Sequence, residues 1–303
     1  ISMSLRAADG VHCSRSAKVR APMSPLDELD PTMEFAERQS LRRPLVHIID
    51  AEADSVAHFR QWSQHGRFYL VRADDRLVEW EGAEQKCSAV REVLQERSAF
   101  CNVRTVEHHG SPAQQHVAEA EVRLLRAGQR NRPNAGDRQR LPGPPLPLRL
   151  VLAEVRDNTG QVLAVWRLLT NLPAEVDAAT VALWYYWRWS IEKYFKLLKT
   201  AGMNAEQWQQ ESAHAIAARL LVASMACVTV WRLARSFNPQ AEDARRFLAR
   251  LSGRQMKRAH PWTMPAMLAG MWNLLAMIHV LEHYTPQQLS QFANIALPNT
   301  RAP

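Results

Sequence analysis

Hydrophobic and polar positions divide the chain into a front part that mixes strands with helices and a back part that is almost wholly helical. The apolar, β-branched run at 45–49 leads into Asp50 and predicts a buried strand with an acid at its carboxyl end. Residues 86–125 contain alternating segments that favour exposed antiparallel strands, whereas residues 1–30 show no regular pattern. The remaining patterns predict strands at 68–73, 148–156 and 162–170 and helices at 31–43, 55–65, 174–200, 211–236, 240–252 and 262–282.

Residues 126–149 interrupt this pattern. With five prolines, three glycines and six arginines against one aspartate, the stretch is expected to form a basic loop. Such a loop is either a solvated connection or an electrostatic grip on a phosphate backbone, and the sequence leaves both interpretations open. The tripeptide N-T-G at 158–160 separates two strand patterns and predicts a hairpin turn.

One predicted helix carries two different faces. Between residues 184 and 199, an advance of about 100° per residue gathers charged groups and a tyrosine within about 80°. This charged face consists of Tyr185, Arg188, Glu192, Lys196 and Lys199. The apolar face, which is expected to pack against a core, consists of Trp187, Ile191, Tyr194, Phe195 and Leu198. An ordinary amphipathic helix with ion pairs four residues apart gives the same pattern, but the flanking Trp184 and Trp189 favour a charged face that meets a ligand.

The charged face fits phosphoryl transfer on DNA. A glutamate such as Glu192 can help to hold a divalent metal ion, cations can bind phosphates, and aromatic rings can pack on sugars or bases. Such a site needs a second carboxylate from another element, and Asp50 at the end of its strand is the obvious candidate. Two Mg²⁺ ions about 4 Å apart need two or three carboxylates. The alternative role for Asp50 is to cap the next helix.

The composition is that of a basic globular protein. The chain has 303 residues, with 38 Lys+Arg and 30 Asp+Glu, so its net charge is +8 and its pI is near 9.7. This balance favours a polyanionic partner such as nucleic acid. The four cysteines have no C-x-x-C spacing and are interpreted as reduced thiols of a cytosolic protein. No signal peptide and no uninterrupted apolar run of about 18 residues is evident, which argues against a secreted or membrane protein.

The spacing of four residues on the charged face resembles a known family signature. The pattern Y-(2)-R-(3)-E-(6)-K of bacterial insertion-sequence DDE transposases, transposon-five-like ones in particular, matches Tyr185, Arg188, Glu192 and Lys199. The stretch W-R-L-L-T at 166–170 resembles the strand that precedes this helix in the family. The stretch D-A-E-A-D at 50–54 resembles the family's D-R-E-A-D, whose first aspartate is the second catalytic acid.

The resemblance implies an α/β fold, namely an RNase H-like catalytic core that is interrupted by a β-rich insertion and followed by an all-helical C-terminal region. The expected domains are part of the core at 1–73, the insertion with its basic loop at 74–170, the core helices with the final glutamate at 171–236, and a helical dimerisation region at 237–303. The implied partners are double-stranded DNA at transposon terminal inverted repeats, target DNA and a second copy in a homodimer on DNA. No membrane is involved, and the expected location is the bacterial cytoplasm, at the nucleoid.

The resemblance also implies a role for each site residue. Asp50 and Glu192 are the middle and final acids of the catalytic triad and ligands of Mg²⁺ or Mn²⁺, with two ions in a complete site. The residues expected to contact transposon-end DNA are Tyr185, Arg188, Trp189, Lys196, Lys199 and Trp166. Trp166 stands where the family has a tryptophan that stacks on a flipped base. Its alternative is a buried tryptophan in a strand.

Several features depart from the family pattern. Ala51 stands where D-R-E-A-D has its arginine. The first catalytic aspartate is expected on a strand well before Asp50, where Asp9 is the only tolerable candidate. The family's N-terminal DNA-binding domain is not evident, and the first residue is Ile. We therefore expect an N-terminally incomplete transposase.

Three functions follow from these observations. The first is a cut-and-paste DNA transposase with metal-dependent strand cleavage and transfer, whose activity is weak or absent without the first acid. The second is a non-catalytic remnant that binds DNA, dimerises and inhibits a full-length relative. The third is an unrelated nuclease with the same core fold, which would cut without preference for transposon ends. The signature spacing argues against this third function.

Overall fold

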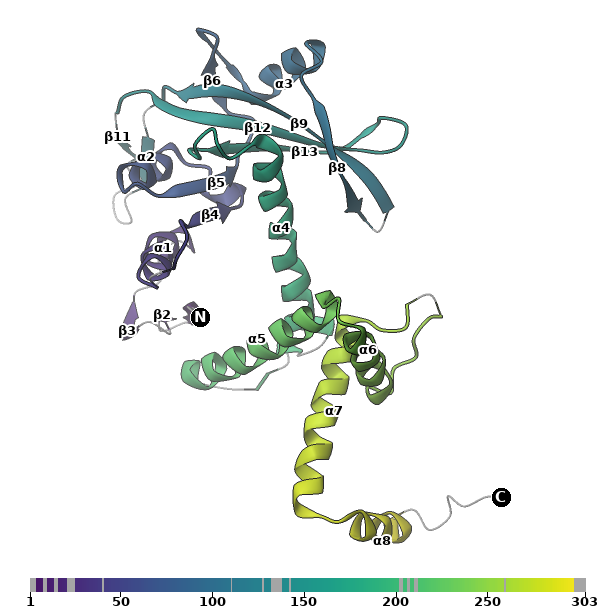
Figure 1. The fold of residues 1–303 in the computed structure, drawn as a ribbon. Helices are drawn as coiled ribbons and strands as arrows, with labels where there is room; N and C mark the ends of the chain where they lie inside the picture. The colour runs from purple at the N-terminus through teal and green to yellow at the C-terminus, as the bar shows by residue number, and fades with distance from the viewer. Residues whose placement is uncertain are drawn as a thin grey trace.

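A long helix, α4 (Ala178–Lys196), runs from a large sheet to a second group of helices (Figure 1). The computed structural model describes residues 4–7, 10–13, 16–20, 25–39, 41–109, 111–126, 128–131, 138–141, 143–201, 204–205, 208–209, 212–258 and 260–296. Asp177 caps the start of α4, where its side chain accepts a hydrogen bond from the backbone N–H of Thr180 at 2.6 Å.

An eight-stranded mixed sheet forms the first region, in the order β4-β5-β13-β12-β9-β6-β7, with β8 paired to β9 off this path. Its strands are β4 (Val46–Ile49), β5 (Phe68–Arg72), β6 (Leu77–Trp80), β7 (Ala83–Lys86), β8 (Cys101–His108), β9 (Ser111–Leu124), β12 (Leu146–Arg156) and β13 (Val162–Thr170). β4 and β5 are parallel, and the other pairs are antiparallel. The carboxyl ends of β4 and β5 therefore lie side by side at one edge.

β12 and β13 lie in the middle of the sheet because their sequences are apolar on both faces. Every residue of 150–155 in β12 is buried, as expected for a strand that is covered on both sides. The turn between the two strands is the predicted hairpin. Asp157 accepts hydrogen bonds from the backbone N–H groups of Thr159 and Gln161, and Gly160 takes a positive φ of 87° that suits glycine.

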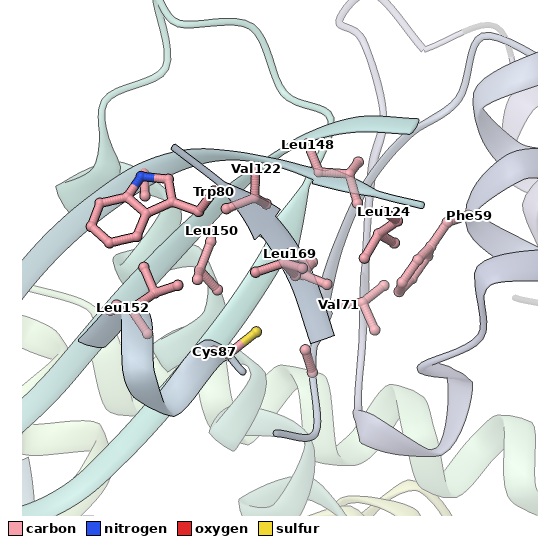
Figure 2. Close-up of a cluster of buried hydrophobic side chains, with 14 of the residues drawn as sticks. Phe59, Val71, Trp80, Cys87, Val122, Leu124, Leu148, Leu150, Leu152 and Leu169 are labelled. Carbon is pink, nitrogen blue, oxygen red and sulfur yellow. The ribbon is translucent and has the colours of Figure 1, made fainter. Parts of the chain in front are cut away.

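Three helices contribute to the core on one face of the sheet. They are α1 (Leu29–Glu37), α2 (Val56–Gln64) and α3 (Cys87–Glu96). Phe59 of α2 and Cys87 of α3 are fully buried in the same cluster as Leu124, Leu150 and Leu169 of the sheet (Figure 2). The first half of α4 packs in a separate cluster, together with Trp166 and Leu168 of β13.

The second region is helical. It contains α5 (Ala213–Arg235), α6 (Pro239–Leu251), α7 (Met264–His283) and α8 (Pro286–Ala296). The end of α4 joins this region, because Leu197 is buried among Cys227 of α5, Leu248 of α6 and Met267 of α7. The helices α6 and α7 approach closely at Gly270, where a Cβ atom would lie 1.8 Å from the carbonyl oxygen of Leu248.

Two of these helices expose long apolar surfaces. By length and composition alone, α5 and α7 could cross a membrane, a test that core helices of soluble proteins also pass. Only 28% and 22% of their apolar windows are buried. The large exposed apolar side chains on α5 and α7 are Leu221, Val222, Met225, Val228, Trp231, Leu275, Met277, Ile278, Val280 and Leu281. These residues are called the α5–α7 apolar surface below.

Most predicted elements from residue 45 onward are present, and four expectations were wrong. The predicted helix at 31–43 starts and ends earlier, as η1 (Pro25–Glu28) followed by α1. Within 86–125, the segment expected to form strands begins with α3. Residues 1–30 contain β1 (Ser4–Ala7), β2 (Gly10–Cys13) and β3 (Ser16–Arg20). The basic stretch 126–149 contains the hairpin β10 (Gly128–Asn131) and β11 (Arg138–Leu141) and the start of β12.

Candidate active site

Asp50 is the meeting point of groups from two different elements. It follows β4, and its Oδ1 accepts a hydrogen bond from the Ala51 backbone N–H at 2.9 Å, which caps the short turn η2 (Ala51–Ala53). The Tyr185 hydroxyl of α4 lies 3.2 Å from the same oxygen and donates a hydrogen bond to it. Arg188, one turn further along α4, places Nη2 3.1 Å from Asp50 Oδ2. The capping role and the contact with α4 therefore coexist.

Arg188 joins Asp50 to Glu192. The same nitrogen, Nη2, lies 3.4 Å from Glu192 Oε1. The arginine side chain is only 13% exposed, whereas the side chains of Asp50 and Glu192 are 41% and 50% exposed. The guanidinium also lies over the ring of Tyr185, at 5.4 Å from its centroid. An enclosed cation therefore lies between two carboxylates that are open to solvent.

A second cation near Asp50, Arg72, was not identified from the sequence. It is the last residue of β5, and its Nη1 lies 3.8 Å from Asp50 Oδ1 with the side chain 43% exposed. The signal was present in the pattern, because charged residues at the carboxyl ends of neighbouring parallel strands meet at one edge. The pairing of β4 with β5 could not be read from the sequence.

Tyr185 is fully buried, and its hydroxyl faces Asp50. Its ring packs on Trp166, with the two ring centroids 5.6 Å apart. Burial raises the pKa of the Tyr185 hydroxyl, which Arg188 opposes. The hydroxyl therefore stays protonated at neutral pH and serves as a hydrogen-bond donor to Asp50.

The expected apolar face of α4 was partly wrong. Trp187, Ile191 and Phe195 are exposed, at 51%, 46% and 47%. Leu198 is buried, and the Tyr194 hydroxyl hydrogen-bonds Ser224 Oγ of α5 at 2.7 Å. The reason is that α4 packs on the sheet with its first half and on α5 to α7 with its end (Figure 1). In the described part of the chain, no single neighbour covers one face of α4 along its whole length.

The two candidate tryptophans differ in exposure. Trp166 is 6% exposed and lies between β13 and α4, which matches its alternative role as a buried strand tryptophan. Trp189 is 38% exposed, and the Arg188 guanidinium lies 6.0 Å from the centroid of its ring. Of these two side chains, Trp189 is therefore the one that a nucleotide could reach without a rearrangement of the core.

The remaining site candidates fall in different parts of the chain. Lys196 ends α4, and Lys199 lies on the π-type turn η3 (Leu197–Ala201); both are exposed. Asp9, the candidate for the first catalytic acid, lies outside the described residues. In the basic stretch, Arg126 is exposed, and its carbonyl accepts a hydrogen bond from Arg60 of α2.

The loops behind Asp50 and Arg72 are held together by Asp54. Its side chain is 4% exposed, accepts a hydrogen bond from the Asp74 backbone N–H at 2.9 Å and pairs with Arg76 at 2.9 Å. Burial raises the pKa of the Asp54 carboxyl, and Arg76 opposes this rise. Because Asp54 follows β4 and Asp74 follows β5, the contact fixes the ends of the two parallel strands relative to each other.

The start of α4 is fastened to the sheet by arginines that the sequence analysis did not single out. Arg149 of β12 donates from Nη1 to the carbonyls of Pro173 and Val176, at 2.9 and 2.8 Å. Arg104 of β8 donates to the carbonyl of Ala179 in the first turn of α4. These contacts fix the loop before α4 and the first turn of α4 on the sheet. They thereby set the direction of the helix, which carries Glu192, relative to the end of β4.

The donors near Asp50 are those that hard cations prefer. Carboxylate oxygens suit Mg²⁺ and Mn²⁺, and both Asp50 and Glu192 present one to the same point. Among the described residues, three side chains of α7 also bring potential metal ligands within 4.8 Å of one another, namely those of His279, Glu282 and His283. Their imidazole nitrogens favour softer metals such as Zn²⁺ or Cu²⁺.

The fold and the site define a mixed α/β protein in which acids and arginines gather where two parallel strands end. Residues 23–228, more than half of the chain, match the transposase DDE domain, and the chain belongs to this family of transposases. The matched span includes β4, Asp50 and Glu192 and ends within α5. No curated protein matches the chain.

Proposed function

We propose that the protein is a DNA transposase that cleaves and joins strands at transposon ends by a cut-and-paste reaction. The observation that carries this proposal is the position of Arg188 Nη2, within 3.4 Å of a carboxylate oxygen of both Asp50 and Glu192. One cationic position is shared by two acids that lie far apart in the sequence. The transposon-five-like spacing supports an active-site role, because in that group the glutamate of the signature is a catalytic acid and the other three residues contact DNA beside it.

The residues at this position fit a divalent metal ion. Two carboxylates that face one point repel each other unless a positive charge lies between them. Asp50 and Glu192 would hold Mg²⁺ or Mn²⁺, which supplies Lewis-acid stabilisation of the charge on the attacked phosphate. Tyr185 orients Asp50 through its hydroxyl, and the exposed cation Arg72 is placed to bind a phosphate oxygen beside it.

An RNase H-like core is the proposed architecture. It is supported by the parallel pair of β4 and β5 and by α4, which packs on the sheet and reaches Asp50. Strands β6 to β12 come between β5 and β13 in the sequence, as expected for a β-rich insertion. In the described part of the chain β4 has β5 as its single neighbour, so its other edge is the place where a strand with the first catalytic acid would pair.

The proposed DNA contacts surround this site. Lys196 and Lys199 are exposed beyond Glu192 on the same segment, and the net charge of +8 favours a phosphate backbone. Trp189, rather than the buried Trp166, is proposed to stack on an unpaired base at the cleavage position. The substrate class is double-stranded DNA that carries terminal inverted repeats.

A homodimer is proposed to hold two transposon ends together. Its support is the α5–α7 apolar surface, because extensive exposed apolar surface on a soluble protein marks interaction sites. A homodimer interface is more apolar than the rest of a protein surface, as α5 and α7 are here. The expected location is the bacterial cytoplasm.

The third acid decides how active this 303-residue chain is. The described residues bring two carboxylates to the Arg188 position, and a DDE site uses three. We therefore expect weak nicking by this chain. This observation also favours the second function, a dimerising protein that binds DNA, cleaves poorly and inhibits a full-length relative in mixed dimers.

Nicking of supercoiled DNA tests the proposed function. A plasmid that carries the element's terminal repeats is incubated with the protein and Mn²⁺, and repeat-free plasmid serves as the substrate control. Weak nicks at the repeats are expected to disappear in Asp50→Asn and Glu192→Gln. The matched control is Glu52→Gln, because Glu52 is an exposed acid two residues from Asp50.

Nicking that persists in both site variants would contradict the proposed catalytic pair. Nicking without preference for the repeats would instead indicate a nuclease of the same core fold. Absence of nicking together with inhibition of a full-length relative would support the second function.

A further inference from the structure

The point shared by Asp50 and Glu192 already contains a cation of the protein itself. Arg188 Nη2 lies 3.1 Å from Asp50 and 3.4 Å from Glu192, at a position where a metal ligated by both acids would also have to lie. A guanidinium so close to two carboxylates screens their mutual repulsion. A divalent ion that enters this position meets a positive charge and must displace it.

The surroundings of Arg188 enclose its side chain but do not provide a hydrogen-bond acceptor for every N–H group. Its side chain is 13% exposed and lies against the ring of Tyr185, and its Nε is buried without a hydrogen-bond partner in the described structure. A buried N–H without an acceptor is unfavourable, so this contact is a compromise. If the guanidinium turned to a group with more oxygen atoms, more of its N–H donors would find hydrogen-bond acceptors.

A DNA phosphate is such an acceptor. Arginine binds phosphate through two parallel N–H groups, and this geometry makes stronger hydrogen bonds than a single nitrogen shared by two carboxylates. Glu192 and Asp50 are both open to solvent, so a backbone that approaches them can reach Arg188 with a short movement of the side chain. The movement would leave the two acids facing each other without a positive charge between them.

We propose that Arg188 is an internal counter-cation that keeps divalent metal away from Asp50 and Glu192 until a DNA phosphate draws it aside. This inference rests on the proposed function and adds the order of assembly to it, with DNA before metal. The free protein therefore holds metal weakly, and cleavage chemistry is confined to DNA that is already bound. Arg188 acts as a positioning residue for the metal site.

Arg72 does not fill the same role. Its Nη1 is 3.8 Å from Asp50, its side chain is 43% exposed, and it makes no contact with Glu192 that is recorded in the described structure. It can therefore bind a phosphate and still leave the point between the two acids unchanged.

The test is the affinity of the full chain for Mn²⁺, measured by electron paramagnetic resonance of the free ion, which needs no catalytic activity. Without DNA, Arg188→Gln is expected to bind Mn²⁺ at least about tenfold more tightly than the wild type, since one repelling charge near the ion is removed. Addition of a short DNA duplex is expected to tighten Mn²⁺ binding by the wild type and to change Arg188→Gln little.

Three variants make the result decisive. Lys193→Gln removes a positive charge from an exposed position of the same helix and is expected to leave Mn²⁺ affinity unchanged. Asp50→Asn and Glu192→Gln identify the Mn²⁺ that belongs to this site and separate it from binding by His279 and His283. Thermal unfolding checks that each variant is folded.

The outcomes separate this inference from the proposed function. Equal Mn²⁺ affinity of the wild type and Arg188→Gln, with binding that depends on Asp50 and Glu192, would overturn the counter-cation role and leave the metal site intact. Weaker binding by Arg188→Gln would also overturn it. Mn²⁺ binding that is insensitive to Asp50→Asn and Glu192→Gln would reject the metal site itself, and the counter-cation with it.

Discussion

At the scale of single residues, Tyr185 contributes to the structure in two ways, through the packing of its ring and through the hydrogen bond of its hydroxyl to Asp50. The ring is buried against Trp166, and the hydroxyl donates to the carboxylate. Tyr185→Phe is expected to lower the free energy of unfolding by about 1 kcal/mol, because one hydrogen bond is lost. Tyr185→Ala is expected to lower it by about 3–5 kcal/mol, because a large cavity forms. Urea unfolding of both variants measures the two contributions, and equal losses would contradict this separation.

Residue environments also predict which thiols react. Burial raises the pKa of the Cys87 and Cys227 thiols to about 11, whereas Cys101 is exposed. Both buried thiols thus remain protonated and covered at pH 8. Mass-spectrometric mapping after iodoacetamide treatment of the native protein is expected to find Cys101 labelled and both Cys87 and Cys227 protected. Labelling of Cys87 at the rate of Cys101 would show that the core around α3 is open, and a urea-unfolded sample provides the fully labelled control.

At the scale of elements, the attachment of α4 to the sheet sets the position of Glu192. Arg149 is 12% exposed, bonds the carbonyls of Pro173 and Val176 and pairs with Glu119. Arg149→Met is expected to destabilise the protein by about 1–2 kcal/mol, because the carbonyls of Pro173 and Val176 lose their donor. The matched control is Arg123→Met, which removes a 56% exposed arginine from its pair with Glu79 and is expected to cost less than about 1 kcal/mol.

Thermal unfolding and Mn²⁺ affinity distinguish the two consequences of Arg149→Met. If Arg149 sets the position of α4, the folded variant is expected to bind Mn²⁺ more weakly at Asp50 and Glu192, even at temperatures below its unfolding transition. Unchanged Mn²⁺ affinity in a destabilised variant would restrict Arg149 to a role in stability.

Sequence patterns predicted some of the helices and strands correctly and failed for others. β12 and β13 were predicted well because each is a long apolar run joined by an N-T-G turn. α3 was missed although Cys87, Val90 and Leu94 follow helical spacing, because the alternation in the neighbouring strands obscured it. The faces of α4 were misjudged because a helical wheel assumes one neighbour along the whole helix.

The candidate site was predicted to a similar extent. The resemblance predicted that Asp50 and Glu192 belong to one site, whereas the contact of Asp50 with Arg188 was not predicted and that with Arg72 depends on which strand lies beside β4. Arg149 depends on a loop whose carbonyls meet it across 24 residues of sequence or more. Local patterns carry no information on such contacts, which only the tertiary structure defines.

At the scale of the whole molecule, the α5–α7 apolar surface predicts self-association. Replacement of Val222 and Leu281 together by glutamate is expected to convert a dimer into a monomer in sedimentation velocity, because buried charges oppose association. The matched control is Leu163→Glu, which changes an apolar side chain of β13 with comparable exposure. A wild-type protein that is monomeric at micromolar concentration would contradict the proposed homodimer.

The central claim, that Asp50 and Glu192 share one divalent ion, is tested most directly by placing a reactive metal at the site. Fe²⁺ with ascorbate and peroxide produces hydroxyl radicals that cut the polypeptide near the bound ion. With DNA present, we expect cuts close to residue 50 and residue 192 that excess Mg²⁺ suppresses and Asp50→Asn removes. Cuts that are confined to α7 near His279, or that miss both acidic positions, would contradict the proposed site.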